Sequence, residues 1–268
     1  MENVLICVFL GLLGAVMGSF AGALVWRLHG RKNFVNDRSE CERCHHKLSI
    51  LDLVPLFSFI FLRGRCRYCR KKIDRSTFAI EIISAAVFVL SYLFFPLAEY
   101  KELLLTLWLV IMTGFLTLGL YDFKYKLLPN KVVYPTFIAA AVFFVVKSVV
   151  ASQGLLGTLS EFALALLPVG GFYLSLWLIG EVTKKSLIGL GDVKLGVILA
   201  CFLTWGGAVS TLFLANIIGA IVMLPMLVSK KIKAKQTVPF GPFLLIAAVV
   251  VFLCQIPIEK IISLMYNI

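Results

Sequence analysis

Charged side chains are scarce in this sequence: Asp, Glu, Lys and Arg make up only 15% of its 268 residues, against 60% hydrophobic residues. A soluble domain is typically about 25% charged and about 45–50% apolar. The mean hydropathy of +0.98 shows the same imbalance. The composition therefore excludes an ordinary soluble domain and predicts an all-α polytopic membrane protein.

Further absences narrow the chemistry. Histidine occurs three times, always between residues 27 and 76, and neither GxSxG nor HExxH occurs. These gaps argue against the serine hydrolases and zinc metalloproteases that carry those signatures. The start Met1-Glu2-Asn3 carries no positive charge, and no Ala-x-Ala-like site follows the first apolar run. We therefore expect a retained helix there and not a removable signal peptide.

Long apolar runs are abundant, and most reach the roughly 20 residues that a membrane-spanning helix needs. We count about eight, at residues 3–26, 77–97, 103–121, 132–150, 161–180, 195–205, 207–228 and 239–257. The run at 195–205 is short, so Gly206-Gly207 is expected to mark a tight turn or a broken helix. The first run carries small residues three and four apart, a face suited to close helix packing: Gly11, Gly14, Gly18, Ser19 and Gly22.

Basic residues are placed unevenly around these runs. If the segments alternate in direction, 23 of the 26 Lys and Arg residues fall on one side of the membrane. The positive-inside rule then makes the insert at 27–76 cytoplasmic and both termini external. We therefore assign the net charge of +12 to membrane topology and expect no nucleic-acid partner. The predicted organisation is an N-terminal transmembrane helix (1–26), a cytoplasmic insert (27–76) and a membrane domain (77–268).

The insert contains two CxxC pairs with 21 residues between them, close to the spacing of a four-thiolate zinc site: Cys41, Cys44, Cys66 and Cys69. A disulfide is disfavoured in a reducing compartment, which leaves a metal-free or redox loop as the alternative. His45 and His46 could replace a ligand, but four cysteines suffice. Such a closed site is structural and not catalytic. The other three cysteines lie inside apolar runs and are expected to be small buried hydrophobes: Cys7, Cys201 and Cys254.

Two aspartates stand at the ends of apolar runs. Asp122 ends the third run, and Asp192 precedes the sixth within Gly189-Leu190-Gly191-Asp192. Alternating segments place both on the cytoplasmic side at similar depth, where the flanking glycines would allow close backbone or peptide approach. A carboxylate beside lipid is costly and needs a reason. Two adjacent carboxyls can share a proton, so that one activates water while the other polarises a peptide carbonyl.

Other interpretations stay open on the residues alone. Asp122 could be a solvated loop charge, because Lys124 and Lys126 follow it. The pair could form the proton relay of a transporter, which predicts inverted repeats and carboxylates near the middle of the bilayer. The chain could also be a membrane scaffold whose four-cysteine loop binds a cytoplasmic partner.

Several motifs in order resemble those of the type IV prepilin peptidases, which are membrane aspartyl proteases. Gly189 to Asp192, followed by Val193-Lys194-Leu195, resembles the second aspartate motif of that family, and Asp122 with Leu127–Lys131 resembles the first. Gly18-Ser19-Phe20 with Arg27 resembles the N-terminal signature of the family. Both CxxC pairs, with Asp52–Ser58 and Arg63–Cys66, resemble its cytoplasmic insert. Pro239–Phe243 resembles its C-terminal motif.

The resemblance implies an activity and its cofactors. Such enzymes cleave the basic leader of prepilins or pseudopilins after a glycine, on the cytoplasmic side of the bacterial inner membrane. Many then methylate the new N-terminal residue from S-adenosylmethionine. By resemblance, Asp122 and Asp192 are catalytic and 77–268 is a membrane peptidase domain. Methyl transfer is expected to map to the insert and the adjoining helix, where Glu81 and the cysteines cluster.

The sequence departs from the family pattern at three positions. Gly22 stands where Asn is common, His29 where Pro is common, and Asn130 where Asp is common. None of them touches the proposed aspartate pair, so cleavage is a firmer expectation than methyl transfer. No glycine-rich strand-turn-helix signature of a nucleotide-type cofactor is visible in the sequence.

Overall fold

The computed structural model describes residues 2–30, 39–41, 43–152, 154–184, 188–229 and 239–256. Within these ranges the regular elements are helical, and β structure is limited to two isolated bridges. Parts of the predicted basic loops, at 31–38, 185–187 and 230–238, lie outside the described residues, as does the end of the last predicted run at 257. The all-α prediction is confirmed for the described chain.

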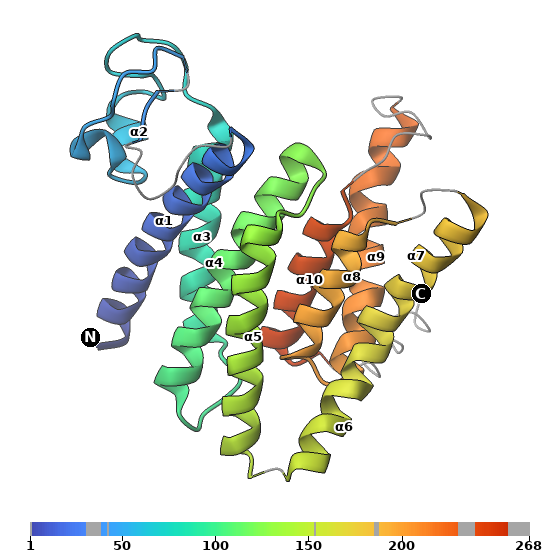
Figure 1. Cartoon of the computed structure of the whole chain (residues 1–268). Helices are drawn as coiled ribbons and strands as arrows, with labels where there is room; N and C mark the ends of the chain where they lie inside the picture. Colours follow the sequence, from blue (N-terminus) through green and yellow to red (C-terminus); the bar gives the residue numbers. More distant parts are fainter. Residues whose placement is uncertain are drawn as a thin grey trace. The chain divides into compact units, whose positions relative to one another are not determined.

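Six helical stretches are long and apolar enough to cross a membrane, which makes the chain a multi-pass membrane protein (Figure 1). They are α1 (Glu2–His29), α3 (Arg75–Leu93), α4 (Lys101–Tyr125), α5 (Asn130–Val150), α6 (Leu155–Leu166) running through a π-helical turn (Leu167–Gly171) into α7 (Phe172–Thr183), and α9 (Trp205–Val228). Two further predicted segments are shorter helices, α8 (Leu190–Ala200) and α10 (Gly241–Cys254). The predicted count of eight segments is thus approximate, because two of the eight form helices shorter than a membrane-spanning helix.

The sixth predicted segment differs from its expected bounds. Helix α8 begins at Leu190 and therefore contains Asp192 in its first turn, and it ends at Ala200. The predicted turn at Gly206-Gly207 is wrong, because both glycines lie inside α9. The break falls just before, at 201–204, where the Thr204 hydroxyl accepts a hydrogen bond from the Gly207 N–H at 3.3 Å. A threonine hydroxyl in this arrangement caps a helix N-terminus, so the chain starts α9 there.

The chain divides into two compact units. The first comprises Met1–Leu93 with Met112–Leu120, and the second Phe94–Ile111 with Tyr121–Ile268. In the first unit α1 packs tightly on α3. A Cβ placed on Gly14 would lie 2.7 Å from the Ser84 carbonyl oxygen, and a Cβ placed on Gly18 would lie 2.8 Å from Glu81 Cα. Backbone contacts this short require glycine, so the predicted small-residue face is a helix-packing face.

In the second unit an aromatic cluster joins four helical segments. Trp108 of α4 stacks on Phe252 of α10 with ring centroids 4.2 Å apart, and it meets Phe202, just after α8, edge-on at 5.2 Å. Phe143 of α5 completes the cluster, and Trp108 and Phe143 are fully buried. The cluster fixes α4, α5, α8 and α10 against one another and so orients the helices that carry the two predicted aspartates.

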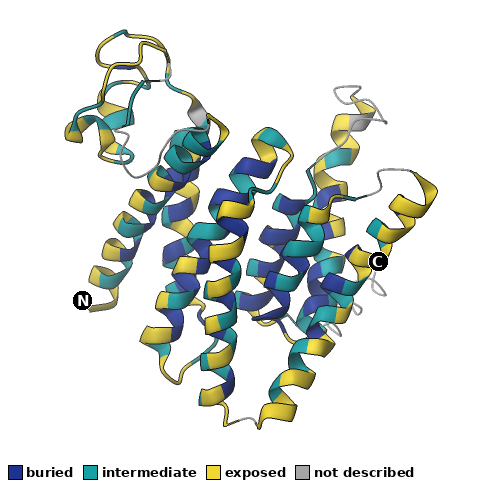
Figure 2. Cartoon of the chain, in the orientation of Figure 1, coloured by how far each residue is buried: buried dark blue, intermediate teal, exposed yellow. Residues whose placement is uncertain are grey.

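Outside these contacts many large apolar side chains of the helices are exposed. Exposed residues, yellow in Figure 2, recur along the helices. In water such a surface would promote aggregation. In a bilayer it faces lipid tails, as expected for a membrane protein.

Candidate functional site

The end of α4, which carries Asp122, and the start of α8, which carries Asp192, lie at the same end of the second unit (Figure 1). Asp122 is in the last turn of α4 and is 7% exposed. Asp192 is in the first turn of α8 and is half-buried. The two carboxylates are close enough for the charge of Asp122 to act on Asp192, although 70 residues of sequence separate them. The sequence prediction that the two side chains meet is consistent with this placement.

A backbone N–H group faces each carboxylate. The N–H of Gly241, the first residue of α10, donates to Asp122, and the N–H of Gly189 donates to Asp192. Both groups stand at the N-terminal end of a helix, where unpaired N–H groups and the helix dipole favour negative charge. These backbone N–H groups thus stabilise negative charge on the two carboxylates.

Gly241 is a site residue that the analysis of single motifs missed. A Cβ placed on it would lie 2.7 Å from Asp122 Oδ2 and 3.3 Å from Leu195 Cδ1, so only glycine lets α10 start here. The available signal was Pro239-Phe240-Gly241-Pro242, a turn followed by a proline suited to the first turn of a helix. Its proximity to Asp122 depends on tertiary packing.

The two glycines before Asp192 differ in their surroundings. A Cβ on Gly191 would lie 2.6 Å from Leu128 Cδ1, so this glycine admits the segment that follows α4. Among the described residues, a Cβ on Gly189 would meet atoms only at 3.8 Å or beyond, which leaves room beside it. Gly191 therefore closes the packing behind the site, and Gly189 leaves space for another molecule to approach.

A polar contact ties α8 to the start of α5. The Lys194 ammonium donates to Asn130 Oδ1 at 2.7 Å. Asn130 is the position at which the sequence departs from the prepilin-peptidase pattern, and its amide oxygen supplies the acceptor for this contact. Beside the same end of the unit, an apolar cavity of about 310 Å³ is lined by α9 and by Pro239, Phe240 and Phe243.

In the first unit the four predicted cysteines converge. Their sulfur atoms all lie within 4.8 Å of one another, with Cys41 Sγ and Cys69 Sγ 3.9 Å apart. A tetrahedral ion with Zn–S bonds of about 2.3 Å would hold its sulfurs roughly 3.8 Å apart. The cluster can therefore hold a metal ion.

The two CxxC loops repeat one backbone pattern. The His45 N–H donates to the Cys41 carbonyl at 2.9 Å, and the Arg70 N–H donates to the Cys66 carbonyl at 3.0 Å. His45 and Arg70 both adopt left-handed conformations, at φ 55° and 59°. Burial opposes ionisation of Cys41, but N–H groups of Cys44 and Arg43 lower the pKa of its thiol to about 7. In the first loop these N–H groups therefore favour the thiolate of Cys41, the form in which cysteine binds a metal ion.

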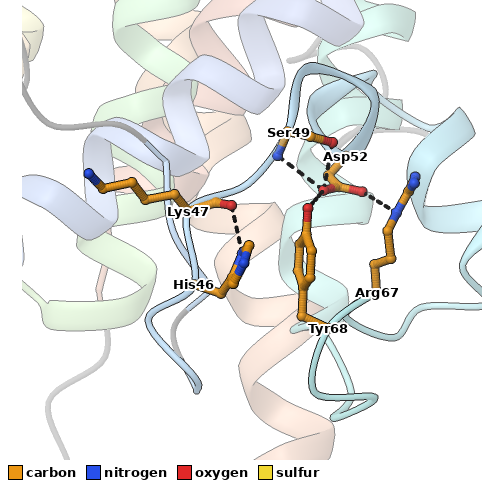
Figure 3. A network of polar contacts seen from close by, with 6 residues as sticks. All are labelled: His46, Lys47, Ser49, Asp52, Arg67 and Tyr68. Atoms are coloured by element: carbon orange, nitrogen blue, oxygen red, sulfur yellow. Dashed lines mark hydrogen bonds and ion pairs between the residues drawn. The ribbon is translucent and has the colours of Figure 1, made fainter.

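The two histidines that follow Cys44, His45 and His46, are engaged elsewhere. His46 stacks on Tyr68 with ring centroids 3.7 Å apart, and its Nδ1 lies 2.8 Å from the Lys47 carbonyl oxygen (Figure 3). His45 pairs with Glu40 at 3.5 Å. The four-cysteine ligand set therefore needs neither histidine.

Asp52 joins the two halves of the insert (Figure 3). Its carboxylate accepts hydrogen bonds from the Ser49 hydroxyl at 2.9 Å and the Tyr68 hydroxyl at 3.2 Å, and it pairs with Arg67 Nε at 2.7 Å. Burial opposes its ionisation, but these bonds and the charge of Arg67 outweigh burial and lower the pKa of Asp52. Residue 52 thus holds the second CxxC loop against the segment after the first.

Glu81 anchors the insert to the helix that follows it. This carboxylate on α3 is buried and accepts the Leu56 N–H at 2.7 Å, with Ser19 of α1 as a further donor. Leu56 has φ 62°, an uncommon conformation for a leucine, and begins α2 (Phe57–Phe61). A buried acid here fixes a strained turn of the insert on the α1–α3 pair.

Comparison with known proteins agrees with these features. The family model described as Bacterial Peptidase A24 N-terminal domain matches residues 12–95, and that of the Type IV leader peptidase family matches residues 103–224. The first match contains the four cysteines of the insert, and the second contains Asp122 and Asp192. No solved structure shows a significant match.

Three relatives are each named prepilin leader peptidase/N-methyltransferase. The Vibrio cholerae protein is 27% identical over 94% of this chain and 98% of its own length. The Aeromonas salmonicida protein is 30% identical over 81% of this chain and 71% of its own length. The Pseudomonas aeruginosa protein is 29% identical over 88% of this chain and 86% of its own. With both family matches in chain order and this coverage, the chain belongs to the type IV leader peptidase family.

Proposed function

We propose that this chain is a membrane aspartyl endopeptidase that removes the leader peptide of prepilins or pseudopilins, with Asp122 and Asp192 as its catalytic pair. The carrying observation is the placement of these two carboxylates at the end of α4 and the start of α8, close enough for the charge of Asp122 to act on Asp192. The names of the relatives support the substrate class. The chemistry needs one shared proton on the pair and one water molecule.

Cleavage then proceeds by exchange of protons. The ionised carboxylate takes a proton from water as the water oxygen adds to the peptide carbonyl, and the protonated carboxylate gives its proton to the carbonyl oxygen. Collapse of the tetrahedral intermediate returns a proton to the leaving amine. The N–H groups of Gly241 and Gly189 stabilise whichever carboxylate is charged. The space beside Gly189 is where we place the scissile peptide.

The positions of the two aspartates favour this function over a proton relay in a transporter. Asp122 lies three residues before the end of α4, and Asp192 lies in the first turn of α8. Both are therefore at helix ends, where a water-borne leader can reach them, whereas a relay would place acids deep in the bilayer.

The topology is part of the proposal. We assign the chain to the bacterial inner membrane with the insert and the aspartate pair on the cytoplasmic side, because 23 of 26 basic residues fall on that side of the predicted segments. The apolar cavity at Phe240 and Phe243 would accept an apolar side chain of a substrate whose remainder lies in lipid.

We propose Zn²⁺ as the ion of the four-cysteine cluster. Four thiolates with this spacing suit its tetrahedral preference, and a closed set of ligands makes its role structural. Bound zinc would neutralise the thiolates and staple an insert that has little apolar core of its own.

Methyl transfer to the new N-terminus from S-adenosylmethionine is proposed from the relatives' names. We assign it to the first unit, where buried Glu81 and the cysteine insert lie together. No hydrogen-bonding pattern within the described residues defines a site for this cofactor.

The proposal is tested by incubating purified protein with a prepilin, with and without S-adenosylmethionine, and weighing the products by mass spectrometry. We expect loss of the leader in both reactions and a further 14 Da, the mass of one added methyl group, only with the cofactor. Intact prepilin in both reactions would contradict the peptidase, and cleavage without methylation would contradict only the second activity.

A further inference from the structure

Tyr173, the second residue of α7, is 1% exposed, and its hydroxyl has no hydrogen-bond partner among the residues that the structure describes. Leaving a buried hydroxyl unpaired destabilises the folded state, so such groups are rare in folded proteins. A phenylalanine would fill the same space without that cost. The hydroxyl therefore calls for a function that the folded chain alone does not supply.

Helix packing places Tyr173 across from Asp192. A Cβ on Gly196 would clash with the Val169 carbonyl oxygen, so α8 touches the π-helical turn at this point. The helix that leads into α7 and helix α8 run in opposite directions (Figure 1). Tyr173 follows Val169 by four residues and Asp192 precedes Gly196 by four, and four residues make about one helical turn. The two side chains are therefore at the same level.

Two further contacts agree with this register. The charge of Asp192 acts on the Tyr173 hydroxyl. The Tyr173 ring also packs on Phe240 at 6.0 Å, directly before Gly241, whose N–H holds Asp122. The π-helical turn that ends at Gly171 rotates the start of α7 relative to α6, and such turns are frequent at functional sites.

We propose that Tyr173 is a positioning residue of the aspartate pair, whose hydroxyl donates a hydrogen bond to the Asp192 carboxylate when the pair engages a peptide. This inference rests on the proposed peptidase function. It also assigns the two roles. With Tyr173 added to the Gly189 N–H, Asp192 has one more donor than Asp122, so Asp192 is the ionised base and Asp122 carries the proton. Tyr173 keeps its own proton throughout.

Few other charged groups face Asp192 from the elements packed on α8. The described residues of α10 and of the π-helical turn carry no Asp, Glu, Lys or Arg. On the other packed helices, Lys194 of α8 bonds Asn130 of α5, and Glu161 of α6 pairs with Lys147 of α5 at 2.9 Å. Lys131 of α5 and Glu181 of α7 are exposed. Asp122 and Tyr173 are thus the side chains that act on the Asp192 carboxylate.

The test compares Tyr173→Phe with Tyr134→Phe, an exposed tyrosine on α5, using a prepilin substrate across a range of pH. We expect Tyr173→Phe to lower kcat by roughly tenfold to a hundredfold, the effect of one charge-assisted hydrogen bond. The acidic limb of its kcat–pH profile should move to higher pH, because the ionised Asp192 carboxylate has lost a hydrogen-bond donor. Its thermal stability should not fall, since the lost hydroxyl was unpaired. Tyr134→Phe should match the wild type.

The outcomes separate this inference from the function on which it rests. A Tyr173→Phe enzyme with wild-type kcat and pH profile overturns the inference while leaving the peptidase standing. Equal losses of activity and thermal stability, with an unmoved pH profile, also overturn it, because they describe a packing residue. If the wild type itself releases no leader, the proposed function has failed first.

Discussion

Gly241 Cα lies so close to Asp122 that an added methyl group would sit 2.7 Å from the carboxylate oxygen Oδ2. The start of α10 thereby fixes the position of an acid on α4, more than 100 residues earlier in the chain. A backbone N–H with a helix dipole behind it is a rigid donor, so this contact sets both the place and the charge preference of Asp122.

Replacing Gly241 with alanine should therefore damage the site directly. The new methyl group must push the carboxylate away or lift α10, so we expect prepilin cleavage to fall by at least about tenfold, as for a misplaced catalytic group. The measurement is initial cleavage rate at equal protein abundance. Gly206→Ala is the matched control, because a Cβ there meets nothing within 4 Å. Unchanged cleavage by Gly241→Ala would contradict the role given to this contact.

The α1–α3 contact should be equally intolerant of a side chain. A Cβ on Gly18 would lie 2.8 Å from both Glu81 Cα and the Ile80 carbonyl oxygen, which are backbone atoms that cannot rotate away. We expect Gly18→Ala to destabilise the first unit by about 1–3 kcal/mol, the usual cost of overpacking. Thermal unfolding in detergent measures the loss. Gly11→Ala, with its nearest contact at 3.6 Å, should unfold like the wild type.

Removal of one thiol should release the metal from the insert. We expect wild-type protein to contain about one zinc ion per chain and Cys44→Ser to retain little, since three ligands bind far more weakly. Elemental analysis after gel filtration measures the ratio. Cys254, expected from the sequence to be buried, is instead exposed at the end of α10. Cys254→Ser should therefore fold normally and keep its zinc. Wild-type protein without bound metal would refute the zinc assignment.

Asp52 should stabilise the insert in a pH-dependent manner. Its folded pKa is lowered, so its stabilisation is present above the unfolded value of about 3.9 and is lost as pH falls through the folded value. Asp52→Asn should open the insert by about 1.5–3 kcal/mol at pH 7, the range for hydrogen bonds to charged groups. Hydrogen exchange over residues 43–74 measures the opening.

The difference between Asp52→Asn and wild type should shrink at low pH, where the wild-type carboxyl is also neutral. Asp74→Asn is the control, because Asp74 is exposed and its hydrogen bonds to Ser76 are local. Equal exchange in wild type and Asp52→Asn at pH 7 would remove Asp52 from the account of insert stability.

Much of this architecture could be predicted from the sequence, because composition and short motifs carry it. Apolar run length predicts the long helices, and CxxC spacing predicts that Cys41 to Cys69 converge. The break before α9 was misplaced because glycines are tolerated in helices, whereas the Thr204 cap is decided by one hydrogen bond. Gly241 and Tyr173 were missed as site residues because only tertiary packing brings them to the aspartates.

The most direct test of the account replaces each aspartate in turn. Asp122→Asn and Asp192→Asn keep the shape of the side chain but remove the shared proton and charge, so each should abolish leader removal, with Glu99→Gln as an exposed acidic control that cleaves normally. The measurement is the mass of a prepilin after incubation with each purified variant. We predict intact prepilin with both variants, and a processed product from either one would contradict the catalytic pair.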